Sequence, residues 1–321
     1  MLGLRLRMYL LTAVLFAVIY AVISIFGYSL GINNFYFYLG LSLVIMMVQY
    51  MLGPKIVEWS MHVKYIGESE YPQLHKMIKE LAATAGLPMP KIGIAQISVP
   101  NAFAFGRTIK DSRICVTQGI LGLLNESELK AVLGHEMSHI KNRDVLTITI
   151  LSVIPMILYR IAWQFMFFGP RRDDRNAPSA AIIGLVAFLF YFLTNLLVLY
   201  ASRVREYFAD KGSVDLGNRP SELASALYKL VYGSARMPKE AIKDVEGMKA
   251  FFANDPSRAM KDFTDLKALD LDKSGSISDA ELSILQSKKL SLSTGDKLME
   301  LLSTHPNMLK RIKRLSDWGN S

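Results

Sequence analysis

Four long apolar stretches restrict the folds that this chain can adopt. They cover residues 8–30, 35–52, 145–168 and 179–201. A helix needs about 20 apolar residues to cross a bilayer, so each stretch has close to the required length. We therefore expect a mainly α-helical membrane protein, anchored by transmembrane helices in a lipid bilayer.

Charges beside the first two stretches indicate their orientation. Arg5 and Arg7 precede the first stretch, Lys55 and Lys64 follow the second, and a neutral link at 31–34 joins the two. Because cytoplasmic flanks carry an excess of Lys and Arg, both outer ends are expected in the cytoplasm. The first stretch is too long for the apolar part of a signal peptide, so we interpret it as an anchor.

The later pair of stretches leaves two topologies open. The third stretch contains Pro155 and Arg160, and its link to the fourth is rich in arginine at 171–175. Charged residues within a span are unfavourable. The pair therefore either crosses the bilayer twice or dips into the interface and returns.

The net charge of +9 and the single cysteine bear on the partners and the redox compartment of the chain. No nucleic-acid-binding motif accompanies the charge, and basic residues beside membrane spans explain it, so no nucleic-acid partner is expected. Cys115 excludes an intrachain disulfide and is typical of a reducing compartment. It lies in an apolar stretch and is expected to be a buried core residue.

The sequence His-Glu-Met-Ser-His that begins at His135 has the spacing of a zinc hydrolase motif. Asn125 and Glu128 predict a capping box that starts a helix before it. On that helix His135, Glu136 and His139 share one sector of little more than a quarter turn. We expect both histidines to ligate one zinc ion, with Glu136 beside it as the general base. The alternative is a solvated helix that carries these residues by chance.

A third ligand is expected just past the fourth apolar stretch. Glu206 and Asp210 are four residues apart and share one helical face. A catalytic zinc site has three protein ligands and an open position, so Glu206 is predicted as the third ligand. Asp210 is predicted to orient a ligand histidine. The alternative is an ordinary charged turn leaving the membrane, with Arg203 and Arg205 as interface anchors.

The location of the site follows from these ligands. They can meet at one ion only if the apolar pair between them returns to the side that it left. The site is therefore expected at the cytoplasmic face.

These features together resemble the HtpX family of membrane zinc metalloproteases, which are relatives of the prenyl-protein-processing CAAX proteases. The likeness is carried by the paired N-terminal spans, by Ala-Val-Leu-Gly before His135, and by Arg-Glu-Tyr-Phe-Ala-Asp ending at Asp210 after the second pair. Thr-His-Pro at 304–306 completes it. The resemblance implies a multi-pass cell-membrane protein with a cytoplasmic zincin-like α+β domain, whose small sheet is expected at about residues 92–120.

A segment before the metal motif is a candidate for substrate binding. Residues 99–106 alternate small and aromatic side chains and resemble the family's Asn-Ala-Phe edge strand, at Asn101, Ala102 and Phe103. An exposed edge binds an extended peptide by adding it as a further strand, which gives broad specificity. The alternative is a hairpin strand whose Phe103 and Phe105 pack in the core.

A second candidate lies near the C-terminus. The resemblance implies that His305 and Arg311 lie near the active site, in contact with substrate or with the oxyanion. Composition alone makes them a helix cap and a solvated charge, with Pro306 at the first position of the helix.

An insert fits the twelve-residue EF-hand calcium loop, from Asp270 at position 1 to Glu281 at position 12, with Gly275 at the turn. The expected ligands are Asp270, Asp272, Ser274, the carbonyl of Ser276, and Glu281. A serine at position 5 weakens the predicted affinity, and no second loop is visible in the sequence. The alternative is an acidic Ser/Gly turn. The family suggests no role for this element, and we hypothesise that Ca²⁺ orders the insert and modulates substrate access.

The predicted organisation has six parts: an N-terminal helix pair (1–53), the first part of the protease domain (54–144), a second apolar hairpin (145–201), the third-ligand helix with the rest of the protease domain (202–260), the EF-hand-like insert (261–292) and a basic C-terminal helix (293–321).

Three functions are compared. The favoured one is a zinc endopeptidase that cleaves misfolded or damaged membrane proteins in stress-related quality control. One alternative is a catalytically silent, calcium-responsive membrane scaffold, which has no need of Glu136. The other is a narrow prenyl-protein-processing protease, for which four apolar stretches are fewer than expected.

Overall fold

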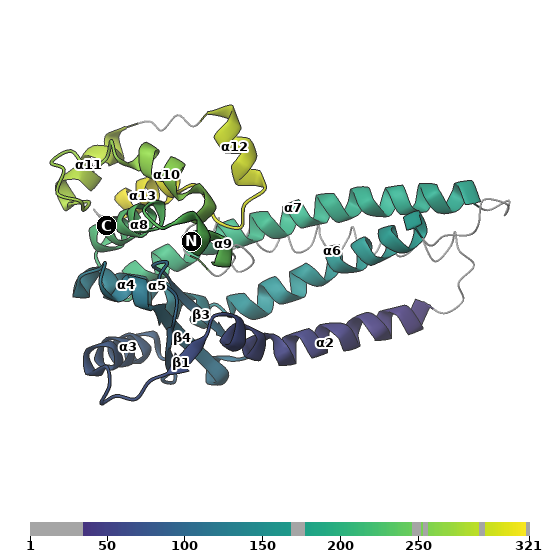
Figure 1. Cartoon of the computed structure of the whole chain (residues 1–321), viewed down its shortest axis with the longest axis horizontal. Helices are drawn as coiled ribbons and strands as arrows, with labels where there is room; N and C mark the ends of the chain where they lie inside the picture. Colours follow the sequence, from purple (N-terminus) through teal and green to yellow (C-terminus); the bar gives the residue numbers. More distant parts are fainter. Residues whose placement is uncertain (1–34, 168–176, 246–251, 253–255, 289–292, 319–321) are drawn as a thin grey trace. The chain divides into compact units, whose positions relative to one another are not determined.

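A computed structural model describes residues 35–167, 177–245, 252, 256–288 and 293–318 (Figure 1). The apolar stretch at 8–30 lies outside the described residues. The chain divides into two compact units, one of Met1–Leu52 with Leu146–Val204 and the other of Gly53–Val145 with Arg205–Ser321. The described residues are mostly helical, with one small sheet, as the sequence predicts.

The first unit is built from parts of three long helices, α2 (Phe35–Ser60), α6 (Asp144–Phe167) and α7 (Ala177–Asp215). Helix α6 continues through Pro155. Within the described part of the chain, one segment, Ile182–Asp215, is long and apolar enough to cross a membrane.

Helices α6 and α7 share an apolar cluster in this unit, which contains Leu151, Ile154, Leu158, Ala162, Ala187, Val198 and Ala201. Other large apolar side chains of α7 remain exposed, among them Ile182, Leu185, Leu189 and Phe192. A helix that is apolar on both its packed and its exposed sides is typical of a lipid environment.

The second unit contains a four-stranded sheet in the order β1-β2-β4-β3. Its strands are β1 (Val63–Tyr65), β2 (Lys91–Ala95), β3 (Ala102–Gly106) and β4 (Ser112–Thr117). β2 and β4 are parallel, and the other two pairs are antiparallel. β3 therefore lies at an edge of the sheet. β1 precedes the range in which the sheet was expected.

Short helices complete the second unit. They are α3 (Pro72–Ala85), α4 (Gln118–Leu121), α5 (Glu126–Lys141), α8 (Pro220–Ala235), α9 (Lys239–Val245), α10 (Ala259–Leu266), α11 (Asp279–Ser287), α12 (Thr294–Leu301) and α13 (Met308–Ser316), with the 3-10 turns η1 (Ile109–Asp111) and η3 (Pro256–Arg258). One apolar core joins α3, α5, α8, α10, α11, α13 and the sheet. In α13, Met308, Ile312 and Leu315 supply its buried face, at the spacing of an amphipathic helix.

The predicted capping box starts α5. The side chain of Asn125 accepts a hydrogen bond from the backbone of Glu128, and Glu128 accepts one from the backbone of Asn125. Glu128 also accepts hydrogen bonds from Ser225 at 2.6 Å and Lys229 at 2.9 Å, both on α8. The cap therefore fixes the start of α5 and ties it to α8.

Candidate metal centre

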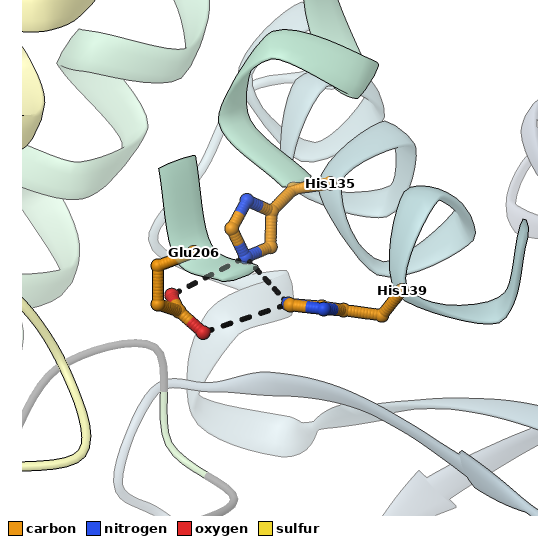
Figure 2. A group of neighbouring side chains, drawn as sticks. All are labelled: His135, His139 and Glu206. Atoms are coloured by element: carbon orange, nitrogen blue, oxygen red, sulfur yellow. Dashed lines mark hydrogen bonds and ion pairs between the residues drawn. The ribbon is translucent and has the colours of Figure 1, made fainter. Parts of the chain in front are cut away.

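His135 and His139 of α5 meet Glu206 of α7 at a common point (Figure 2). The Nε2 atoms of the two histidines lie 3.1 Å apart. His135 Nε2 lies 3.6 Å from Oε2 of Glu206, and His139 Nε2 lies 3.6 Å from Oε1. The structure thus brings together the three ligands predicted from two distant segments.

Two glycines allow α5 and α7 to approach this closely. A Cβ atom on Gly134 would lie 2.3 Å from Nδ2 of Asn218, and one on Gly212 would lie 2.0 Å from Oγ of Ser138. Real Cβ atoms do not approach other atoms so closely, so a side chain at either position would displace the side chains that it meets at this contact. The hydroxyl of Ser213 also donates to the carbonyl of Ala131, at 2.6 Å.

Each ligand histidine has a carboxylate on its other ring nitrogen. His135 Nδ1 lies 2.9 Å from Oδ1 of Asp210, the partner predicted from the sequence. His139 Nδ1 lies 2.6 Å from Oδ2 of Asp144. When Nδ1–H donates to a carboxylate, Nε2 keeps its lone pair, so both Nε2 lone pairs point toward Glu206.

This donor set fits a cation. Two lone pairs and a carboxylate that face one another in a buried site repel or remain unsatisfied unless a positive charge lies among them. Ligands that share a tetrahedral zinc ion at about 2.0–2.2 Å lie roughly 3.3–3.6 Å apart, close to the observed separations. His135, His139 and Glu206 could therefore hold zinc.

Arg311 on α13 contacts both Glu206 and Asp210. Its Nη2 and Nε donate to the two carboxylate oxygens of Asp210, at 2.6 and 2.9 Å. Its Nη1 lies 3.1 Å from Oε2 of Glu206. Arg311 is fully buried, so the interpretation of it as a solvated charge is wrong.

His305 also lies beside the site. Its Nδ1 is 3.4 Å from Oε2 of Glu206, and its ring is 11% exposed. The cap of α13 is Asn307, which accepts a hydrogen bond from the backbone of Leu309, and the helix begins at Met308. The expectations that His305 caps this helix and that Pro306 occupies its first position are therefore wrong.

Glu136 is 5% exposed and is close enough to His135, His139 and Glu206 for their charges to act on its carboxyl. Burial raises the pKa of its carboxyl, while the neighbouring charges of His139 and His135 oppose that rise. A hydrogen bond from the backbone of Ala104 reaches it from β3. The edge strand and the predicted general base are thus in direct contact.

The residues of the candidate peptide-binding segment are almost fully buried. Asn101, Ala102 and Phe103 are buried. Phe103 and Phe105 stack with ring centroids 5.8 Å apart, in an apolar cluster that includes Cys115 and Phe252. Both phenylalanines therefore pack in the core, as the alternative interpretation predicted, and Cys115 is buried as expected.

The EF-hand-like loop gathers three of its expected ligands. Carboxylate oxygens of Asp270, Asp272 and Glu281 lie within 4.8 Å of one another. Gly275 has a φ of 78°, which suits the turn at position 6. Ser274 and Ser276 face each other, with their hydroxyl oxygens 3.0 Å apart. No ion is needed to hold Glu281, which accepts backbone hydrogen bonds from Leu271 and Ser278.

Sequence reasoning missed Asp144 and misread Arg205. Arg205 forms an ion pair with Asp144 instead of anchoring the helix at an interface. Asp144 follows His139 by five residues, so on a continuous helix the two would point about 140° apart. No helical periodicity could therefore have identified it.

Comparisons with known proteins identify the family of this chain. Residues 68–319 match Peptidase family M48. The "Protease HtpX homolog" of Methanothermobacter thermautotrophicus is 51% identical over 228 residues, which cover 71% of this chain and 86% of that protein. "Protease HtpX homolog 2" of Methanosarcina mazei is 34% identical over 316 residues, covering 98% and 95%.

One solved structure is also similar, the "Crystal Structure of S. mikatae Ste24p". It has a TM-score of 0.48 and 16% sequence identity, and the match covers 98% of this chain and 67% of that chain. A likeness of this degree supports no inference about function.

Proposed function

This chain belongs to peptidase family M48 and is an HtpX-type protease, and from that premise we propose that it is a membrane-bound zinc endopeptidase that cleaves misfolded or damaged membrane proteins. One observation carries the proposal. The Nε2 atoms of His135 and His139 and the carboxylate of Glu206 converge beside the buried Glu136. This arrangement supports hydrolysis of a peptide bond.

The proposed hydrolysis assigns one role to the metal and one to Glu136. When bound, zinc supplies Lewis acidity that makes water nucleophilic near neutral pH. Glu136 accepts the proton of that water and delivers it to the leaving amine. The raised pKa of Glu136 suits it as general base and then as general acid, because the carboxyl must retain the proton of the water until the amine leaves.

His305 is the candidate for contact with the substrate or the oxyanion. It is mostly buried, and its Nε2 has no hydrogen-bond partner among the described residues. Such a nitrogen can donate to an oxygen that develops negative charge. We assign Arg311 a different role, because its guanidinium is fully buried and occupied by Asp210 and Glu206. It holds these carboxylates in place.

The substrate is proposed to bind as a strand beside β3. This strand lies at a sheet edge and contacts Glu136 through Ala104. Because Asn101, Ala102 and Phe103 are almost fully buried, they would support this edge from within, and strand pairing would use the backbone of the less buried Ala104 and Gly106. Backbone pairing is insensitive to sequence, which agrees with unfolded polypeptides as substrates.

We further propose a multi-pass arrangement in the cell membrane with the site in the cytoplasm. The apolar helix Ile182–Asp215 and the basic residues that flank the predicted spans support it. Glu206 follows the apolar part of that helix directly, so the site would lie near the bilayer surface.

A comparison of wild type with Glu136→Gln tests the proposed activity. The purified full chain in detergent would be assayed for zinc content and for cleavage of casein and of an unfolded membrane protein. We expect Glu136→Gln to keep its zinc and lose activity by about 10²-fold or more. Glu126→Gln, an exposed glutamate on the same helix, should cleave like wild type. Equal activity in wild type and Glu136→Gln would exclude the protease, and a wild type that binds no zinc would exclude the metal site.

A second proposal concerns the insert, which we propose binds Ca²⁺ through Asp270, Asp272, Ser274, Ser276 and Glu281. The grouping of three carboxylates at EF-hand spacing supports it. Helix α11, which begins within the loop, packs in the same core as α13. Lys313 of α13 also donates to the carbonyl of Leu285 in α11, at 3.0 Å. Calcium binding that orders the loop would thus affect α13, the helix that carries Arg311, through its contacts with α11.

A further inference from the structure

Asp144 lies between a histidine and an arginine, as Asp210 does. We propose that Asp144, held by Arg205, is a positioning residue that fixes the metal-binding orientation of His139. This inference rests on the proposed metal site and extends it by two residues. Asp144 is the first residue of α6, and Arg205 comes immediately before the ligand Glu206 on α7.

The turn between α5 and α6 brings Asp144 to His139. Helix α5 ends at Lys141 with Asn142 as its cap, and Arg143 has a φ of 54°. A left-handed conformation is uncommon for a residue other than glycine. It breaks the helical path, so that Asp144 returns to lie 2.6 Å from Nδ1 of His139. The local backbone is therefore shaped to make this contact.

The carboxylate of Asp144 divides its two oxygens between two partners. Oδ2 accepts the Nδ1–H of His139, and Oδ1 pairs with Nη1 of Arg205. Asp144 is 6% exposed, and a buried carboxylate requires such a cation. With Nδ1 engaged, the imidazole ring cannot rotate freely and Nε2 stays directed toward His135 and Glu206.

Asp210 and Arg311 do the same for His135. Asp210 lies 2.9 Å from Nδ1 of that ring, and Arg311 grips Asp210 with two nitrogens. Each predicted ligand histidine thus contacts an aspartate, which in turn contacts an arginine. We call each such set of three residues a row. Helix α7 contributes to both rows, through Arg205 and Asp210, and supplies the third ligand between them. Docking of this one helix therefore orients all three ligands together.

Metal affinity tests the proposal without reference to activity. The metal-free full chain in detergent would be titrated with Zn²⁺ in competition with a chelator, and with Co²⁺ to record the visible absorption of the coordinated ion. Loss of an outer partner of a ligand histidine typically weakens metal binding 10–100-fold. We expect Asp144→Asn to weaken zinc binding to this extent and to change the Co²⁺ spectrum. Arg205→Gln should weaken binding less.

Two further variants keep the result unambiguous. Asp215→Asn removes an exposed carboxylate of α7 that pairs with the nearby Lys211, at 2.5 Å. It should bind zinc like wild type. The double variant Asp144→Asn/Arg205→Gln leaves no unpaired buried charge, so it should fold well and still bind zinc weakly.

The outcomes separate this inference from the proposed function. Wild-type affinity and an unchanged Co²⁺ spectrum in Asp144→Asn would overturn it while the metal site stands. Recovery of wild-type affinity in the double variant would also overturn it, because the unpaired Arg205 would then explain the loss. A wild-type chain that binds no zinc would instead refute the proposed function.

Discussion

The Nε2 atoms of His135 and His139 lie 3.1 Å apart, while the other nitrogen of each ring faces a carboxylate. This relationship fixes what the site can do. Both rings direct Nε2 toward one point beside Glu206, where a bound cation would satisfy all three groups. The chain thus places this group of buried polar side chains beside an apolar core.

Removal of the metal should abolish activity and lower stability together. A chelator strong enough to extract zinc leaves two lone pairs and a carboxylate opposed in a buried space. A metal present at about 1,000 times its Kd contributes about 4 kcal/mol to the free energy of unfolding. We therefore expect chelation to lower the Tm and zinc to restore both Tm and cleavage. Full activity in protein shown to contain no metal would contradict this prediction.

Gly134→Ala should disturb the close contact between α5 and the end of α7. Its new methyl group would meet Asn218 and Ser213, and overpacking of this kind typically costs about 1–3 kcal/mol of unfolding free energy. We expect a lower Tm and reduced zinc content. Gly122→Ala is the matched control, because a Cβ there meets no atom within 4 Å. If Gly134→Ala had the Tm and zinc content of Gly122→Ala, the close contact would not set the ligand distances.

Arg311→Lys should destabilise the site although it keeps the charge. A lysine offers a single point of contact and cannot reach Asp210 and Glu206 with a planar fork. Removal of one charge from a buried ion pair costs about 3–5 kcal/mol, so this charge-conserving change should cost less than that. Thermal unfolding and zinc content would measure the loss. Arg219→Gln, which removes an exposed charge 3.9 Å from Asp279, should change stability by less than about 0.5 kcal/mol. Equal effects of the two variants would argue against the role of Arg311.

Cys115 should resist thiol reagents in the folded protein. Burial raises the pKa of its thiol to about 12, whereas an unfolded cysteine has a pKa near 8.5. At pH 8 the fraction of reactive thiolate is then roughly 10³-fold lower in the folded state. Because the folded pKa is the higher one, this group's contribution to stability is complete below about pH 8.5 and is lost as the pH rises through about 12.

The rate of alkylation at several pH values would check this, with denatured protein as the reference. Cys115 is the single cysteine of the sequence, so the modification is unambiguous by mass. Equal rates in folded and denatured protein at pH 8 would show that the thiol is accessible.

Calcium should raise the stability of the insert if the loop binds it. We expect Ca²⁺, but not the same concentration of Mg²⁺, to raise the Tm of wild type and to slow proteolysis of residues 261–292. Asp270→Asn with Glu281→Gln should eliminate both responses, because it removes the charges at positions 1 and 12. Asp265→Asn, outside the loop, should retain them. A Ca²⁺ response that persists in the double variant would argue against this site.

Local spacing in the sequence was sufficient to predict the ligand set. The positions of His135, Glu136 and His139 depend only on the helical repeat, as does the shared face of Glu206 and Asp210. The capping box of Asn125 and Glu128 is equally local, and the structure confirms it. The buried core position of Cys115 followed from its apolar neighbours.

Other features depend on parts of the chain that are distant in sequence or on single backbone angles. The left-handed conformation of Arg143 turns Asp144 toward His139, and no periodic pattern encodes it. The burial of Arg311 follows from the packing of α13 beside α7, which makes this residue the clamp of two carboxylates and not the solvated charge of the composition-based alternative. Likewise, only the order of strands shows that β3 lies at an edge with its aromatic side chains turned into the core.

The sequence by itself therefore determined which residues are the candidate metal ligands, because helical periodicity is a property of a few neighbouring residues. The tertiary structure decided how they are held. Asp144, Arg205 and Arg311 acquire their roles only when α5, α7 and α13 pack together. A buried charge is unfavourable unless an opposite charge lies beside it, and the fold decides which opposite charge that is.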